Sequence, residues 1–245
     1  MDTLHKWLQK AAGLTEQVSY SNPNYRILFY HNAAYVYWNI AQYERALESI
    51  NCALSILRPD KSLTVSDLKL RAQIYDAVYC EQNERLSEET GMLTVGQDSG
   101  NAYLILAERD LEEAIALQRQ LPHGEESPSY AGDLAGLHYV MSQNLGYRGY
   151  YEEAVAEIDR ALELEIAAEL KQDLYATYYQ AAIVRLGAYT KWKKKRFLAE
   201  ILECLDKAEE EIMYNETADA YYFLEDVRKL RKHALKELEN RGGGH

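Results

Sequence analysis

The 245-residue sequence is poor in residues that break or cross-link a chain, with 13 Gly, 4 Pro and 3 Cys. Cys52, Cys80 and Cys204 are widely spaced and form no CxxC pair, which argues against a disulfide framework and fits a reducing cytoplasm. Free cysteines are usually buried, so we interpret all three as small core residues and not as nucleophiles.

Long apolar runs are also missing. No stretch reaches the roughly 18 to 20 apolar residues that a membrane span requires, and the N-terminal residues lack the apolar core of a signal peptide. We therefore expect a soluble protein of the cytoplasm that has no membrane segment.

Positive charge is scarce: 27 Lys and Arg stand against 39 Asp and Glu, giving a formal net charge of -12. This balance repels phosphate backbones, so we expect protein or peptide partners and no nucleic acid. The chain is 47% hydrophobic and contains 21 Tyr, which is too apolar for a disordered segment and sufficient for a buried core.

Apolar residues recur at steps of three and four, and strand alternation is nowhere sustained, which predicts an all-α protein. We expect an N-terminal segment (1–23) with a short helix, a helical domain (24–240) and a flexible tail or tag remnant (241–245). The predicted helices are 3–12, 24–40, 43–57, 64–87, 101–121, 128–147, 151–167, 170–190, 196–213 and 217–240.

Internal repetition is the strongest signal. Residues 43–54 align without gaps to residues 151–162, 108 positions later, with six of twelve positions identical. Ala46 and Ala154 are small where a preceding helix must approach closely. The other shared apolar positions continue one buried stripe. They are Ile50, Ile158, Ala53 and Ala161.

The helices that precede these segments carry related spacings. They are Tyr30-x2-Ala33-Ala34-x2-Tyr37 and His138-x2-Met141-Ser142-x2-Leu145. Together with the Ala-x3-Ile segments, the pattern resembles the tetratricopeptide repeat (TPR) family. The resemblance implies a helical-hairpin solenoid, a right-handed superhelix of about four helix pairs with a C-terminal capping helix. The second pair, over 64–121, is lengthened by a loop insertion.

The resemblance also implies a binding groove lined by the first helix of each pair. Aromatic rings with amides alongside suit an extended peptide or a partner helix. The alternative is that the tyrosines pack between helices and the amides face solvent, and both roles stay open here. The candidate groove residues are His31, Asn32, Tyr35, Trp38, Asn39, Arg71, Tyr75, Tyr79, Gln82, Tyr139, Gln143, Tyr147 and Tyr179.

Residues 191–196 (KWKKKR) form the only dense basic run of the sequence. One interpretation is a surface for nucleic acid or an acidic partner. The other is a solvated turn whose positive charge favours the C-terminus of the preceding helix.

Catalytic motifs are missing: there is no Gly-rich phosphate loop, no HExxH and no GxSxG, and the six histidines lie in separate predicted elements. We expect no enzyme, no cofactor and no metal. The leading hypothesis is an interaction module, an adaptor or scaffold that binds a peptide or partner helix. The alternative is a peptide-responsive regulator resembling bacterial TPR peptide sensors, without a DNA-binding domain. The partner and the oligomeric state are not specified by the sequence.

Overall fold

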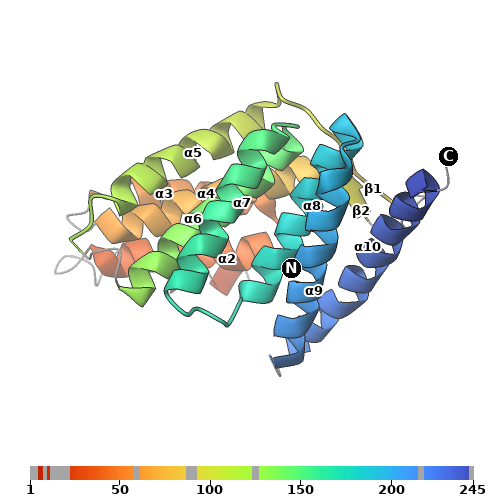
Figure 1. The fold of residues 1–245 in the computed structure, drawn as a ribbon. Helices are drawn as coiled ribbons and strands as arrows, with labels where there is room; N and C mark the ends of the chain where they lie inside the picture. Colours follow the sequence, from red (N-terminus) through yellow and green to blue (C-terminus); the bar gives the residue numbers. More distant parts are fainter. Residues whose placement is uncertain are drawn as a thin grey trace. The chain divides into compact units, whose positions relative to one another are not determined.

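The computed structural model describes residues 5–7, 10–11, 23–57, 61–86, 93–122, 127–214 and 218–242. Within these residues the chain is an all-α protein of adjacent helix hairpins followed by a terminal helix (Figure 1), which confirms the predicted fold class. The helices are α2 (Asn24–Asn39), α3 (Tyr43–Ser55), α4 (Lys61–Asn83), α5 (Ala102–Gln118), α6 (Pro128–Tyr147), α7 (Tyr151–Ala167), α8 (Leu174–Trp192), α9 (Lys195–Tyr214) and α10 (Ala218–Gly242).

The helices belong to two compact units, each of which we describe by itself. Unit 1 comprises residues 1–81 and 106–122, and unit 2 comprises residues 82–105 and 123–245. Of the predicted helix 3–12, residues 5–7 and 10–11 are described and are helical. At the other end, α10 continues to Gly242, two residues into the predicted tail.

The core of unit 1 lies between α2, α3 and α4. Ala46 and Ile50 of α3 are fully buried there, as the repeat pattern predicts. The small Ala46 side chain allows α2 to approach closely, and Ile50 fills the space beside it. The buried residues of this core are Ala34, Tyr37, Ala46, Ile50, Ala53, Leu70 and Ile74.

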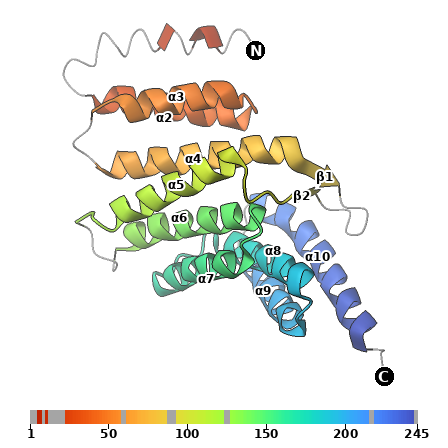
Figure 2. The ribbon, with the colours of Figure 1, turned by 90° about the horizontal axis from the view of Figure 1, so that it is seen from above.

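Unit 2 contains the hairpins α6–α7 and α8–α9, with α7 packed against α8 and α10 packed mainly against α9. Figure 2 shows α10 alongside α8 and α9. Ala154 and Ile158 of α7 are fully buried, like their counterparts on α3. The two copies of the repeat therefore build equivalent hairpin cores.

The turns of these two hairpins match in backbone geometry. Ala41 and Gly149, which are 108 positions apart, both adopt positive φ values, 55° and 76°. In each turn the following residue donates its backbone N–H to a carbonyl near the end of the preceding helix: Gln42 to Tyr37, and Tyr150 to Leu145, both at 2.9 Å. Each bond caps an otherwise unpaired carbonyl of the helix end.

A short antiparallel ribbon follows α4 and differs from the prediction. The helix predicted over 64–87 ends at Asn83, and β1 (Glu84–Leu86) pairs with β2 (Leu93–Val95) in unit 2. The backbone groups that a longer helix would have satisfied internally are satisfied between these two strands. The ribbon closes where Gly96 donates its N–H to the Asn83 carbonyl at 3.3 Å.

Candidate functional site

Helix α2 carries apolar residues on two opposite faces. One face, which includes Ile27, Ala34 and Tyr37, is buried in unit 1. Its hairpin partner α3 segregates its residues in the usual amphipathic way, with Ala46 and Ile50 buried and charged residues facing outward. Burial in the core accounts for only one of the two apolar faces of α2.

The other face of α2 is exposed, and we call it the α2 face. Tyr35 is 51% exposed and Leu28 is 44% exposed, and Val36 lies beside them. The exposed amide of Asn32 lies between Leu28 and Tyr35 along the helix, and that of Asn39 follows one turn after Val36. The α2 face therefore consists of Leu28, Asn32, Tyr35, Val36 and Asn39.

Local contacts hold parts of the α2 face in place. The rings of Tyr35 and Trp38 meet edge to face with their centroids 5.8 Å apart, and Trp38 is half-buried. The Asn39 Nδ2 donates to the Tyr35 carbonyl at 2.8 Å. Its amide oxygen and its second N–H are then the groups that it can offer to a partner.

His31, another predicted site residue, supports this helix from beneath. Its Nδ1 lies 2.6 Å from the Oδ1 of Asp67 on α4, and Asp67 is only 1% exposed. The bond supplies a buried carboxylate with a partner. Sequence inspection missed this pair because the two residues are 36 positions apart.

Arg71 does not join the α2 face. Its Nε and Nη2 bind the two carboxylate oxygens of Asp110 on α5 at 2.7 and 2.8 Å, and its Nη1 donates to Asn51 on α3. The hydrogen bonds to Asp110 raise the pKa of Arg71. The Arg71 side chain thus links three helices of unit 1, and its groove role stays a prediction.

Two of the predicted groove tyrosines are buried. Tyr79 on α4 is 1% exposed, and Tyr179 on α8 is also buried, where its ring meets Phe223 of α10 at 5.6 Å. Burial raises the pKa of Tyr179. The rings of Tyr79 and Tyr179 therefore pack between helices, which is the alternative role that the sequence left open. Tyr75 is half-buried, and Gln82 is exposed near the end of α4.

The remaining predicted residues, Tyr139, Gln143 and Tyr147, lie half-buried on α6 in unit 2. The Gln143 Nε2 lies 3.4 Å from the Tyr139 hydroxyl, so the first two contact each other. Burial raises the pKa of Tyr139 to about 12, and the nearby Glu165 carboxylate adds to this shift. The exposed predicted residues that the structure brings together are thus Asn32, Tyr35 and Asn39.

The cysteines and His138 also carry reactive or metal-binding groups. Only Cys204 is buried as expected, because Cys80 is half-buried and Cys52 is exposed. His138 pairs with Glu157 at 2.5 Å, a contact that sequence spacing did not reveal.

Among the described residues no group of His, Cys, Asp and Glu is arranged to hold a metal ion. No helix in the described part of the chain combines the length and apolar character needed to cross a membrane.

Comparisons with known proteins establish the fold alone. No family model and no curated protein matches the sequence. The crystal structure of BtubC (BKLC) from P. vanneervenii is similar, with a TM-score of 0.56 and 12% identity over 98% of this chain and 91% of that chain. The C-terminal part of a TPR repeat-containing protein from Cytophaga hutchinsonii aligns with a TM-score of 0.32 and 19% identity over 96% and 92% of the two chains. The first match shows a shared fold, and the second is too weak to add to it.

Proposed function

We propose that this chain is a non-catalytic protein-interaction module that binds a peptide or a partner helix on the α2 face. One observation carries the proposal: α2 exposes an apolar face, centred on the half-exposed ring of Tyr35, directly opposite its buried face. Contiguous apolar surface that remains exposed on a folded protein commonly marks a contact site for another protein.

The chemistry of the α2 face suits a polypeptide ligand. Tyr35 offers a large ring with few rotatable bonds, so that its ordering on binding costs little entropy. Asn32 and Asn39 offer amide groups that can pair with a peptide backbone or with polar side chains. The face thus combines apolar area with hydrogen-bonding groups, as the cores and rims of protein interfaces do.

The length of the α2 face sets the size of the ligand. Leu28 and Asn39 are separated by eleven residues, which spans about 17 Å along a helix. An amphipathic helix of about three turns, or an extended segment of about five residues, covers that distance. Anchors at the i, i+4 and i+7 positions of a partner helix would match this spacing.

The repeat pattern supports the placement of the chain among TPR-like proteins. The hairpins that contain the aligned segments have matching turns and matching buried alanines. In that class the first helix of a pair carries the binding surface, and α2 is the first helix of its pair.

The test uses peptides selected from a display library against the purified chain. We expect the double variant Tyr35→Ala/Asn32→Ala to bind the selected peptide at least about tenfold more weakly by fluorescence anisotropy, because the central ring and its neighbouring amide are lost. Helical circular dichroism should be unchanged, since both side chains are exposed.

A matched control is available in unit 2. Tyr214 and Asn240 are both exposed, so Tyr214→Ala/Asn240→Ala removes the same two side-chain types elsewhere. This variant should bind like the wild type. Equal binding by the α2 variant and the wild type would refute the assignment of the site to the α2 face.

A further inference from the structure

The basic run lies in the turn between α8 and α9 of unit 2, and we call residues 191–196 the basic turn. All its Lys and Arg side chains are exposed, while Trp192 is half-buried. Lys193 occupies the turn with a φ of 54°. Five cations therefore gather on a short surface segment of a chain whose net charge is -12.

Aromatic rings support these cations from below. Trp192 stacks on Phe197 with centroids 5.9 Å apart, and it meets the edge of Tyr151 at 6.4 Å. The Nζ atoms of Lys191 and Lys194 lie 5.4 and 5.8 Å from the Trp192 ring centroid. Such contacts hold the ammonium groups at the surface by cation–π attraction.

The position of the Tyr151 ring depends on a close approach between α7 and α8. A Cβ atom at Gly187 would lie 2.1 Å from Cε1 of Tyr151, so only glycine leaves room for that ring. Lys191 crosses the same region, and its Nζ donates to the Gly149 carbonyl at 2.9 Å. The basic turn is thus fastened to the α6–α7 turn and does not extend freely into solvent.

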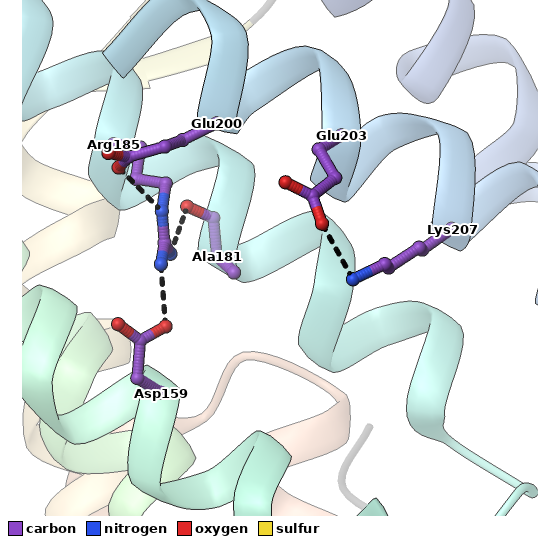
Figure 3. Close-up of polar contacts among 6 residues, drawn as sticks. All are labelled: Asp159, Ala181, Arg185, Glu200, Glu203 and Lys207. Carbon is purple, nitrogen blue, oxygen red and sulfur yellow. Dashed lines mark hydrogen bonds and ion pairs between the residues drawn. The ribbon is translucent and has the colours of Figure 1, made fainter. Parts of the chain in front are cut away.

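The cations at the start of α9 lack acidic partners. Among the residues that the structure describes, no carboxylate lies within ion-pair distance of Lys194, Lys195 or Arg196. Elsewhere on the same helix pair, Arg185 is paired with Asp159 at 2.6 Å and Lys207 with Glu203 at 2.9 Å (Figure 3). Within the described part of the chain, Lys194, Lys195 and Arg196 are therefore left without a carboxylate partner.

Helix stability explains only part of this arrangement. Lys191 lies in the last turn of α8, where positive charge is favourable. Lys194, Lys195 and Arg196 lie at the N-terminus of α9, where the helix dipole disfavours positive charge. By contrast, α7 begins with Glu152 and Glu153. The solvated-turn interpretation accounts for Lys191 but not for Lys194, Lys195 and Arg196.

We propose that the basic turn docks an acidic segment of a partner protein, an extended stretch of Asp and Glu. Three adjacent unpaired cations offer charge-assisted bonds to several carboxylates at once. The site is separate from the α2 face and does not depend on the function proposed for it.

The rings favour an acidic peptide over a nucleic acid. Single-stranded nucleic acids bind by stacking bases on open aromatic faces. Here Tyr151 and Phe197 are buried, and Trp192 is stacked on Phe197. The acidic remainder of the chain would also repel a long phosphate backbone, whereas a short acidic peptide contacts the basic turn alone.

The probe is a fluorescein-labelled oligoglutamate of about eight residues, titrated with the full chain at low ionic strength. We expect saturable binding that weakens as salt is added. The triple variant Lys194→Gln/Lys195→Gln/Arg196→Gln should bind about tenfold more weakly, because three exposed ion pairs together are worth about one order of magnitude.

The control changes the same number of charges elsewhere in unit 2. Lys171, Lys232 and Lys236 are exposed, so Lys171→Gln/Lys232→Gln/Lys236→Gln lowers the net charge by the same three. This variant should retain the wild-type affinity to within about twofold. Circular dichroism of both variants verifies the fold.

Four outcomes would overturn the proposal. Equal losses in the two triple variants would show that bulk charge alone attracts the peptide. An oligothymidylate of similar charge that binds more tightly than the peptide would make the surface a nucleic-acid site. Self-association that the basic-turn variant abolishes, seen by sedimentation, would make a second copy of the chain the occupant. The absence of measurable peptide binding would remove the site altogether.

Discussion

The α2–α3 hairpin of unit 1 and the α6–α7 hairpin of unit 2 carry equivalent residues at their centres. Ala46 and Ile50 in the first, and Ala154 and Ile158 in the second, are all fully buried. In unit 1 this core also includes Leu70 and Ile74 of α4, so a neighbouring helix completes the burial that the repeat predicts.

The first helices of the same two hairpins differ in what they expose. Asn32 is exposed, whereas Val140, its counterpart 108 positions later, is buried. Tyr35 is exposed, whereas its counterpart Gln143 is half-buried. Helix α6 packs against α8 as well as α7 within unit 2. The comparison teaches that the repeat sets the inside of each hairpin, while its neighbours decide which outer face stays open.

The largest expected effect tests the shared core. Ile50→Ala and Ile158→Ala should each cost about 2 to 5 kcal/mol of unfolding free energy, because each leaves a cavity at a fully buried site. Urea denaturation, with amide hydrogen exchange to follow each unit, measures the loss. Leu57→Ala is the control, since Leu57 is 93% exposed. A neutral result in either hairpin would break their equivalence.

An exchange of turn residues sharpens the comparison further. Gly149→Ala should cost about 1 to 2 kcal/mol, because φ is positive there and the new Cβ would lie 3.0 Å from the Gln97 Oε1. Ala41→Gly should leave stability unchanged or raise it by up to about 1 kcal/mol, because it relieves the strain of a positive φ. Thermal unfolding of both variants measures these changes. The same sign for both would show that the turns differ in strain.

The smallest effect concerns alkaline stability. The pKa of Tyr139 is raised by burial to about 12, above the value of about 10 for an unfolded tyrosine. Between these values the unfolded chain loses its proton first, so stability falls as pH rises through this range. Tyr139→Phe should remove part of this decline, measured as urea midpoints at about pH 9 and about pH 11. An unaltered decline in the variant would place the effect on other groups.

The hairpins could be predicted from sequence because their signals are local. The spacing of Ala46 and Ile50, and its repetition at Ala154 and Ile158, indicated both the helices and their buried stripe. The β1–β2 ribbon was missed, since its pairing joins two short segments that are separated in the sequence by residues 87–92. Local propensity contains no information about such a partner.

The site was harder to predict because exposure depends on distant neighbours. Tyr35 and Tyr79 both lie on first helices, yet one is exposed and the other is buried. Arg71 had the spacing of a groove residue, but it forms a bidentate hydrogen bond with the carboxylate of Asp110, 39 positions later. Spacing along one helix cannot show which residues of another helix will cover it.

The lack of a side chain at Gly187 has a consequence for substitutions at this position. The Tyr151 ring occupies the space that a side chain at position 187 would need. Its hydroxyl accepts a hydrogen bond from the Gln97 Nε2, and the Lys191 Nζ lies 5.8 Å from the ring centroid. A descendant that gains even a methyl group at position 187 must therefore shrink or relocate this ring, and both attachments with it. A substitution at position 187 therefore disturbs the Gln97 hydrogen bond and the Lys191 contact at the same time.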